Sequence, residues 1–334
     1  MMKIKSLGKL ACKLIVLGIL CLVLAASISV GIDPYNVFHW SDARDNGVEP
    51  NKNYVKTQYV LHNPEKYNMF IFGNSRVGSL DASKIVDGNC YNMYYSEGLP
   101  AEHYENLVAF LEAGVDVQRI YLGIDDVSCF VDPAIHDEQL IRRPFKAKEA
   151  NISFLWDYMD PSVALQSLET ICAYEDKEEG FSERLYSTGN YYLDSSLTEE
   201  SLAQEQWPNY FAWYGEEALE DIAQIVALCE EKQIELVVFV NPEYQVRFEE
   251  AVANGYTDFL YGLAEITGYY SFCGINRVTT DMQNFHDISH YRMEVGDAML
   301  AVMQGEEIDA DLAAEGFGQY VTKENVEAYI STLQ

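Results

Sequence analysis

The chain has 334 residues, a formal net charge of −31 and an aromatic content of 13%, including 24 tyrosines. This aromatic content argues for a folded protein rather than a disordered one, and the length allows one enlarged domain or two. The negative charge argues against nucleic acid or an anionic membrane surface as a partner of the main body.

The N-terminus has the pattern of a membrane anchor. Lys3, Lys5, Lys9 and Lys13 precede an uncharged, apolar stretch over residues 14–32. At about 1.5 Å per residue, a helix of this length spans roughly the 30 Å hydrocarbon core. We therefore predict a cytoplasmic basic segment over residues 1–13, a transmembrane helix over 14–32 and an extracytoplasmic main body. A cleaved signal peptide is the alternative, because small residues lie at 25–27.

The seven cysteines are widely spaced, and no two of them have the C-x-x-C spacing of metal ligands. The pattern predicts neither a dense disulfide framework nor a zinc ribbon. We expect most of these thiols to be small core residues, and we expect no metal and no cofactor.

Residues 33–66 are predicted to form a stem that leads to the globular part, because residues 33–53 are polar and turn-rich. Strand-like and helical segments then alternate, which predicts a doubly wound α/β domain with a mostly parallel sheet over residues 67–303. The predicted strands are 69–72, 90–94, 119–122, 235–240 and 269–272, and the clearest helices between them are 102–113 and 216–232.

Two regions depart from this alternation. Residues 130–213 form a predicted insertion, with a helix at 161–174, an acidic run at 175–179 and tyrosines at 186, 191 and 192. The insertion either shapes substrate specificity or is a surface excursion. Residues 304–334 form an acidic extension that is helical from about Thr322, a suitable N-cap.

A serine follows the first predicted strand, in the stretch Gly73-Asn74-Ser75. Parallel strands carry their functional groups at this carboxyl edge, so Ser75 is a candidate nucleophile. The alternative is an ordinary turn in which the serine caps the next helix.

A base for this serine lies near the C-terminus, at the same predicted edge of the sheet. Asp287 precedes His290 by three residues, so its carboxylate can accept a hydrogen bond from the ring Nδ1–H and turn Nε2 toward a nucleophile. We predict Ser75 as nucleophile, His290 as general base and acid, and Asp287 as the residue that orients the imidazole.

These two motifs resemble the first and fifth sequence blocks of the SGNH/GDSL hydrolases. The motifs are Gly73-Asn74-Ser75-Arg76 and Asp287-Ile288-Ser289-His290, and the resemblance covers roughly residues 67–303. It implies a flavodoxin-like fold and a serine esterase or acyl (acetyl) transferase.

The anchor resembles the membrane-anchored members of that family, such as the D-alanine transfer protein of teichoic acid synthesis and the alginate O-acetylation proteins. That resemblance implies a cell-surface polysaccharide or acylated polymer as substrate. It also implies a membrane-embedded acyltransferase as partner.

The resemblance further implies an oxyanion hole made by the backbone N–H groups of Ser75 and Gly98. Asp125 stands where the family has an asparagine donor, and an ionised carboxylate cannot donate. Asn241 is a candidate substitute, with a turn before proline as its alternative role. Arg76 and Asp125 are candidates for binding substrate, or they form a structural ion pair.

Two other functions stay open. His286 and His290 have the i, i+4 spacing of a zinc site on a helix, which predicts a metallohydrolase that metal analysis would reveal. A non-catalytic SGNH-like scaffold or glycan-binding protein of the cell envelope is the other alternative, and Asp125 favours it.

Overall fold

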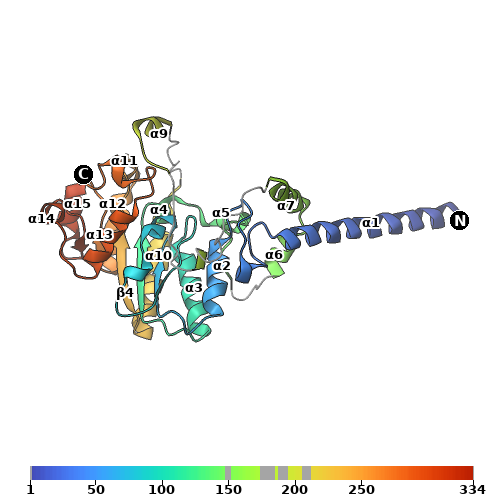
Figure 1. Cartoon of the computed structure of the whole chain (residues 1–334), viewed down its shortest axis with the longest axis horizontal. Helices are drawn as coiled ribbons and strands as arrows, with labels where there is room; N and C mark the ends of the chain where they lie inside the picture. Colours follow the sequence, from blue (N-terminus) through green and yellow to red (C-terminus); the bar gives the residue numbers. More distant parts are fainter. Residues whose placement is uncertain (1, 147–151, 174–184, 187–194, 205–211, 334) are drawn as a thin grey trace.

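The computed structural model describes residues 2–146, 152–173, 185–186, 195–204 and 212–333 (Figure 1). A six-stranded sheet with the order β2-β1-β3-β4-β5-β6 forms its centre. All neighbouring strands are parallel except β5 and β6, which are antiparallel. The strands are β1 (Met69–Phe72), β2 (Cys90–Asn92), β3 (Arg119–Ile124), β4 (Glu235–Val240), β5 (Tyr269–Ser271) and β6 (Gln319–Val321). The predicted α/β class with a mostly parallel sheet is confirmed.

Helices cover both faces of this sheet. Because side chains alternate along a strand, Phe70 and Phe72 of β1 join one buried cluster while Met69 and Ile71 join another. The first cluster lies under α3, α10, α12 and α15, and the second under α13. These helices are α3 (Pro100–Glu112), α10 (Gly215–Lys232), α12 (Tyr256–Ile266), α13 (Met293–Met303) and α15 (Val326–Leu333).

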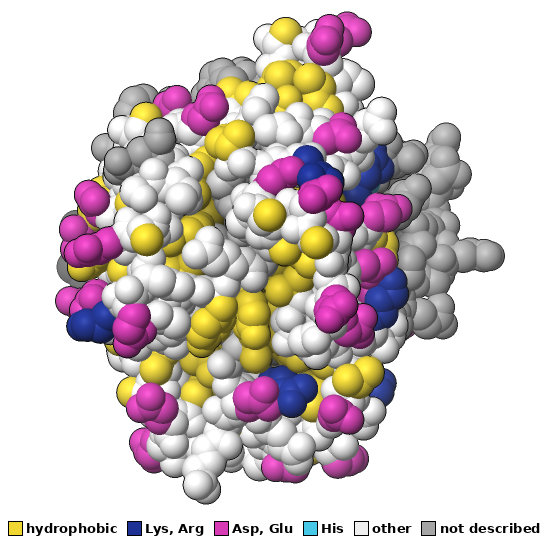
Figure 2. Space-filling view, turned by 90° about the vertical axis from the view of Figure 1, so that its left-hand side faces the viewer, with side chains coloured by type: hydrophobic (Ala, Val, Ile, Leu, Met, Phe, Trp, Pro, Cys, Tyr) yellow, Lys and Arg dark blue, Asp and Glu magenta, His cyan; other side chains and the backbone are white. Residues whose placement is uncertain are grey.

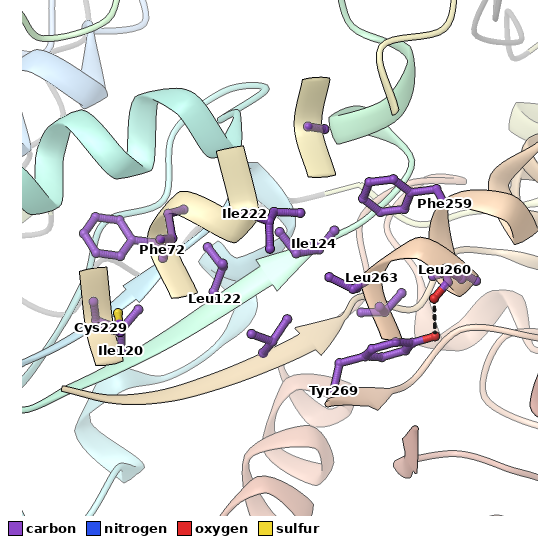
Figure 3. Close-up of a cluster of buried hydrophobic side chains, with 14 of the residues drawn as sticks. Phe72, Ile120, Leu122, Ile124, Ile222, Cys229, Phe259, Leu260, Leu263 and Tyr269 are labelled. Carbon is purple, nitrogen blue, oxygen red and sulfur yellow. Dashed lines mark hydrogen bonds between the residues drawn. The ribbon is translucent and has the colours of Figure 1, made fainter. Parts of the chain in front are cut away.

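Helix α10 illustrates how sequence pattern becomes packing. Its buried residues include Ile222, Ile225 and Cys229, at spacings of three and four that place them on one face. Figure 3 shows two of them against side chains of β3, Cys229 next to Ile120 and Ile222 next to Ile124. Each such aliphatic or aromatic side chain contributes about 1.5–3 kcal/mol by its burial.

Residues 33–66 do not form the polar stem that we predicted. Within this range, helix α2 (Lys52–Leu61) packs against the domain and buries Tyr54, Val55 and Val60. Lys56 is also buried, and its Nζ donates to the carbonyl of Asn92 at the end of β2 over a distance of 3.0 Å. The polar, turn-rich composition behind the prediction covers residues 33–53, whereas α2 begins at Lys52 and is buried on several sides.

The C-terminal extension takes part in the sheet rather than trailing from it. Tyr270 of β5 pairs with Tyr320 of β6, so the chain adds an antiparallel edge strand before α15. A short helix, α14 (Ala310–Ala314), precedes β6.

Several helices lie in the described parts of the insertion or directly before it. They comprise α4 (Val127–Phe130), α5 (Pro133–Glu138), α6 (Ile152–Asp157), α7 (Pro161–Ala173) and α9 (Glu199–Gln204). Tyr186 is buried and stacks on Tyr59 of α2 at a centroid distance of 4.5 Å. The acidic run at 175–179 and the tyrosines at 191 and 192 lie outside the described residues.

Helix α1 (Met2–Ile32) extends from one end of the molecule (Figure 1). Its stretch Gly8–Ile32 is long and apolar enough to cross a membrane. All seven cysteines fall in the described ranges and are free thiols, so no disulfide links any two of them. Figure 2 shows the end opposite α1, where acidic side chains are scattered over the whole face and apolar ones lie in its middle.

Ile222 offers a test of the core. Ile222→Ala removes a fully buried side chain between α10 and the sheet and should lower the free energy of unfolding by about 2–5 kcal/mol. The measurement is urea unfolding of the full chain in detergent, followed by near-UV circular dichroism. Val86→Ala, at a position that is 59% exposed, is the control and should change stability by less than about 0.5 kcal/mol. Equal effects of the two substitutions would contradict this packing.

Candidate active site

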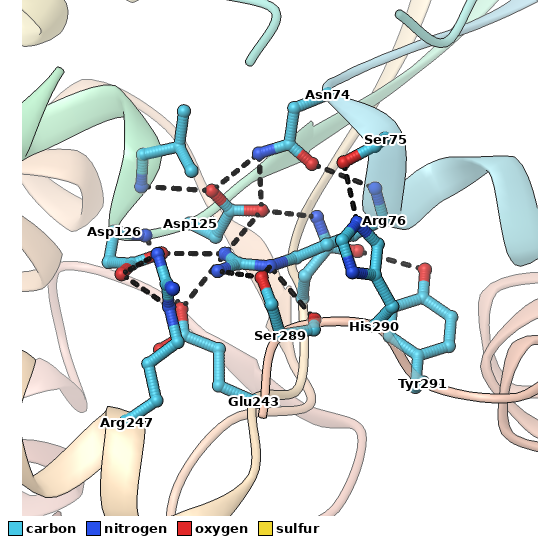
Figure 4. Close-up of polar contacts among 12 residues, drawn as sticks. Asn74, Ser75, Arg76, Asp125, Asp126, Glu243, Arg247, Ser289, His290 and Tyr291 are labelled. Carbon is cyan, nitrogen blue, oxygen red and sulfur yellow. Dashed lines mark hydrogen bonds and ion pairs between the residues drawn. The ribbon is translucent and has the colours of Figure 1, made fainter. Parts of the chain in front are cut away.

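The polar residues of the predicted site meet at the carboxyl edge of the parallel strands (Figure 4). A 3₁₀ helix, Ser75–Ser79, follows β1 with Asn74 as its N-cap. Asp125 and Asp126 follow β3, and Asn241 follows β4. The loop at 285–292, which leads into α13, completes the site. Because parallel strands end at one edge, four distant segments are brought together here.

Two glycines allow the serine turn to approach the sheet. A Cβ at Gly73 would lie 2.6 Å from Cγ1 of Val77, and one at Gly123 would lie 2.4 Å from the same atom. Any larger residue would displace Val77, which follows the serine by two positions. The glycine before Asn74 is therefore required for packing of this turn.

Ser75, His290 and Asp287 form a continuous hydrogen-bonded relay. The Ser75 Oγ lies 2.7 Å from the His290 Nε2, and the His290 Nδ1 lies 2.8 Å from the Asp287 Oδ2. The side chain of His290 is 19% exposed and that of Asp287 is 32% exposed, so the relay is partly open to solvent. A carboxylate on Nδ1 holds the ring in the tautomer in which Nε2 accepts the serine proton.

The carboxylate of Asp287 is held in place by its own loop. Its Oδ1 accepts the backbone N–H of Ser289 at 2.7 Å and that of His290 at 2.8 Å. Burial by itself raises the pKa of Asp287. The hydrogen bond and charge of His290, together with the two backbone donors, outweigh burial and lower this pKa to about 2. Asp287 is therefore ionised at neutral pH.

The geometry does not favour the zinc alternative. Residues 286–290 form a turn rather than a helix, in which the His286 N–H donates to the carbonyl of His290 at 2.8 Å. The Nδ1 of His286 lies 2.8 Å from the carbonyl of Ser195, away from the relay. Among the described residues, no group of three or more His, Cys, Asp or Glu is arranged to hold a metal.

Arg76 is buried behind the serine rather than facing a substrate. The residue is 1% exposed, and its Nη1 lies 2.9 Å from Asp125 and 2.6 Å from Asp126. Its Nε donates to both the carbonyl and the hydroxyl of Ser289 at 3.0 Å. Of the two roles predicted for Arg76, the geometry matches the structural ion pair and not the binding of substrate.

Asp125 is likewise turned away from solvent. Its side chain is fully buried and accepts from Asn74 Nδ2 at 2.8 and 2.9 Å, from Asn241 Nδ2 at 3.0 Å and from the N–H of Val127 at 3.1 Å. These donors and Arg76 surround the carboxylate. Asp125 is therefore neither placed to bind substrate nor aimed at a developing oxyanion.

Asn241 does not provide the substitute oxyanion donor that we considered. It is fully buried, its Nδ2 donates to Asp125, and its Oδ1 accepts from the hydroxyl of Tyr291 at 3.0 Å. Both ends of the amide are thus used inside the protein. Gly98 donates its N–H to the carbonyl of Tyr95 over a long 3.4 Å. By contrast, the N–H of Ser75 donates to no described residue.

Sequence reasoning missed Glu243 and Arg247, which complete the buried charge cluster. Arg247 Nη2 lies 2.8 Å from Asp126, and Glu243 Oε1 lies 3.2 Å from Arg76 Nη1. Burial, and then the neighbouring charge of Asp126, raise the pKa of Glu243 well above its ordinary value. The cluster thus brings two guanidinium groups together with three carboxyl groups, of which Glu243 is the one whose ionisation burial disfavours. Asp125 and Asp126, at the end of the apolar strand β3, were the sequence signal for cationic partners, because buried carboxylates require them.

Comparison of the chain with protein-family models, with curated proteins and with solved structures finds no match.

The contact between Asn74 and Asp125 predicts that exchanging these two residues recovers part of the stability that the single substitutions remove. Asn74→Asp places a second carboxylate against Asp125 and should destabilise the protein by about 3–5 kcal/mol, as breaking a buried pair does. The double variant Asn74→Asp/Asp125→Asn restores one amide and one carboxylate. We expect a favourable coupling energy of about 0.5–3 kcal/mol in a double-mutant cycle measured by urea unfolding.

Asn89→Asp adds the same charge at an exposed position and is the control for the exchange. It should leave stability nearly unchanged. Strictly additive effects of the two single substitutions at 74 and 125 would show that the two side chains do not interact.

Asp287 predicts a pH dependence of stability. Its folded pKa of about 2 is lower than the ordinary 3.8, so its stabilising contribution is present above about pH 4 and is lost as the pH falls toward 2. Asp287→Asn should therefore flatten the dependence of unfolding free energy on pH in that window. Asp116→Asn, at an exposed position, should keep the wild-type slope. Parallel curves for wild type and Asp287→Asn would argue against an ionised, hydrogen-bonded Asp287.

Proposed function

We propose that the protein is a membrane-anchored, extracytoplasmic serine esterase or acyltransferase that acts on ester groups of a cell-surface glycan or polymer. The observation that carries the proposal is the relay in which Ser75 Oγ lies 2.7 Å from His290 Nε2, with Asp287 on the opposite ring nitrogen. A serine hydroxyl needs such a base before it can attack an ester carbonyl. Here the base is itself oriented by a carboxylate.

In the proposed reaction, His290 Nε2 removes the hydroxyl proton as Ser75 Oγ forms a bond to the carbonyl carbon. The imidazolium that results is stabilised by Asp287 and gives its proton to the departing alkoxide, which leaves an acyl-serine. An acceptor hydroxyl, from water or a sugar, then loses its proton to His290 and attacks the acyl carbon. Departure of Ser75 with that proton restores the enzyme.

The negative charge of the tetrahedral intermediate requires donors near Ser75. The Ser75 N–H, which donates to no described residue, is the first of them. The Gly98 N–H is the second, because its 3.4 Å bond to Tyr95 is long enough to be shared. An enzyme with two backbone donors and no asparagine lacks one contribution to its oxyanion hole, and one such donor is worth about 3–4 kcal/mol of the barrier.

We also propose a flavodoxin-like, SGNH-type fold for residues 67–303. Support comes from the strand order β2-β1-β3-β4-β5, which is the flavodoxin-like order, with β6 added at the edge. The serine turn follows β1, and the loop with Asp287 and His290 leads into α13. Both motifs thus occupy the places that the resemblance implies.

The proposed location follows from α1. A basic segment before an apolar helix favours a cytoplasmic N-terminus and an extracytoplasmic domain. A catalytic domain held there would meet surface polysaccharides, and a membrane-embedded acyltransferase is the proposed source of acyl groups. A role of the insertion in specificity is supported by its contact with the loop at 285–292, where the Leu197 N–H donates to the carbonyl of Phe285 at 3.2 Å.

A non-catalytic scaffold or glycan-binding protein is the second candidate. The observation that favours it is the orientation of Asp125, which is buried and points at Asn74 and Arg76 instead of supplying a donor to the serine. A protein could keep this fold and relay while binding a partner. Reactivity of the serine separates the two candidates.

The test is covalent labelling of Ser75 by a fluorophosphonate probe, read by mass spectrometry and in-gel fluorescence on the full chain in detergent. We expect labelling of wild type and its loss in Ser75→Ala and His290→Ala. Asp287→Asn should slow labelling by about 10²–10⁴-fold, because the imidazole loses its orienting carboxylate.

His286→Ala is the matched control, since this histidine lies in the same loop but contacts Ser195 instead of the relay. It should label at the wild-type rate. An acetyl-ester assay on wild type and Ser75→Ala then measures turnover. Absence of labelling in folded wild-type protein would favour the scaffold.

A further inference from the structure

Helices α6 and α7 lie beside the end of α1 at which that helix meets the globular part (Figure 1). Two hydrogen bonds fix them there. The Tyr158 hydroxyl, at the α6–α7 connection, donates to Asp33 Oδ1 at 2.7 Å, and the Tyr35 hydroxyl donates to Gln166 Oε1 of α7 at 2.8 Å. Asp33, which directly follows α1, is 1% exposed. The helix pair is therefore held at a defined position relative to α1.

The face of α7 that is covered consists of small or short side chains. These are Val163, Ala164, Ser167 and Thr170, all of which are buried, and α7 packs along α1. Small residues allow two helices to approach closely. The covered part of α1 begins at about residue 25, since residues 8–24 are exposed.

Several large apolar side chains of the pair are uncovered. On α7, Leu165 is 62%, Leu168 43% and Ile171 56% exposed, and on α6 Trp156 is 68% exposed. Outside α1, Trp156 and Leu165 are the most exposed large apolar side chains among the described residues. An exposed apolar patch of this kind marks a surface that contacts another apolar phase or molecule.

The depth of α7 follows from the charges on α1. Lys13 is the last charged residue of α1. A helix of about 20 residues crosses the roughly 30 Å hydrocarbon core. If the core begins after Lys13, it therefore ends near Asp33. The part of α1 from residue 25 onward, along which α7 packs, then lies in the outer leaflet. Because α7 packs along this part of α1, its uncovered Leu165 and Leu168 lie at the same depth.

We infer that α6 and α7 form an interfacial element that inserts its apolar face into the outer leaflet and holds the catalytic domain against the membrane. This inference rests on the proposal that α1 spans the membrane, and it is independent of the serine chemistry. Lipid is the occupant that fits, because Trp156 is of the type that concentrates at the membrane interface. Glu169, exposed on α7, requires the insertion to be shallow, with its carboxylate among the headgroups.

The experiment places an environment-sensitive fluorophore at single cysteines in full-length protein reconstituted into phosphatidylcholine vesicles. The exposed native cysteines Cys12, Cys21 and Cys172 are replaced by serine, and this background without a new cysteine is the labelling blank. Leu168→Cys and Ile171→Cys probe the interfacial element. Leu20→Cys probes α1, and Val86→Cys is an exposed control on the globular part.

We expect blue-shifted emission and quenching by doxyl-labelled lipids at positions 20, 168 and 171, with neither effect at 86. Quenching at 20 but not at 168 or 171 would overturn the inference while leaving the anchor intact. If probes at 168 and 171 are shielded only in native membranes and not in pure lipid, the face docks on a membrane protein, which also overturns it. No quenching at 20 would refute the anchor itself, without bearing on labelling of Ser75.

Discussion

The buried guanidinium of Arg76 is the constraint on which the site depends. A desolvated charge is stable only when it is paired and its donors are satisfied. Arg76 pairs with Asp125 and Asp126 after β3, and it donates to Ser289 in the loop at 285–292. Arg76 follows Ser75 in the chain, and Ser289 precedes His290. The contacts that pair the guanidinium of Arg76 therefore also hold Ser75 and His290 close to each other.

The polar edge of the sheet is divided into two layers. Ser75, His290 and Asp287 are partly exposed to solvent, whereas Asp125 and its partners are buried. This division explains how Asp125 can occupy a position where the SGNH-like pattern has asparagine. The amide of Asn74 donates to the carboxylate of Asp125, so the buried layer joins one amide and one carboxylate directly.

The proposed chemistry and the proposed membrane contact occupy different parts of one body. The relay lies at the carboxyl edge of the sheet, and α6 and α7 lie at the end of α1 (Figure 1). Helix α2, which replaces the expected stem, packs on the domain and connects the two regions. A domain held this way would present the serine at a fixed height above the membrane. Such an arrangement suits an acyl donor or acceptor that is itself attached to the envelope.

The sequence by itself determined the α/β class, the apolar helix of α1 and the relay residues, because these depend on local periodicity and on motifs at strand ends. It placed Ser75, Asp287 and His290 at one edge, since parallel strands all end there. Only the tertiary structure decided the roles of Arg76, Asp125 and Asn241, and the partnership with Glu243. Whether a charged side chain faces solvent or another charge depends on burial by segments that are far away in the chain. A local sequence pattern does not show which distant segments will cover a residue.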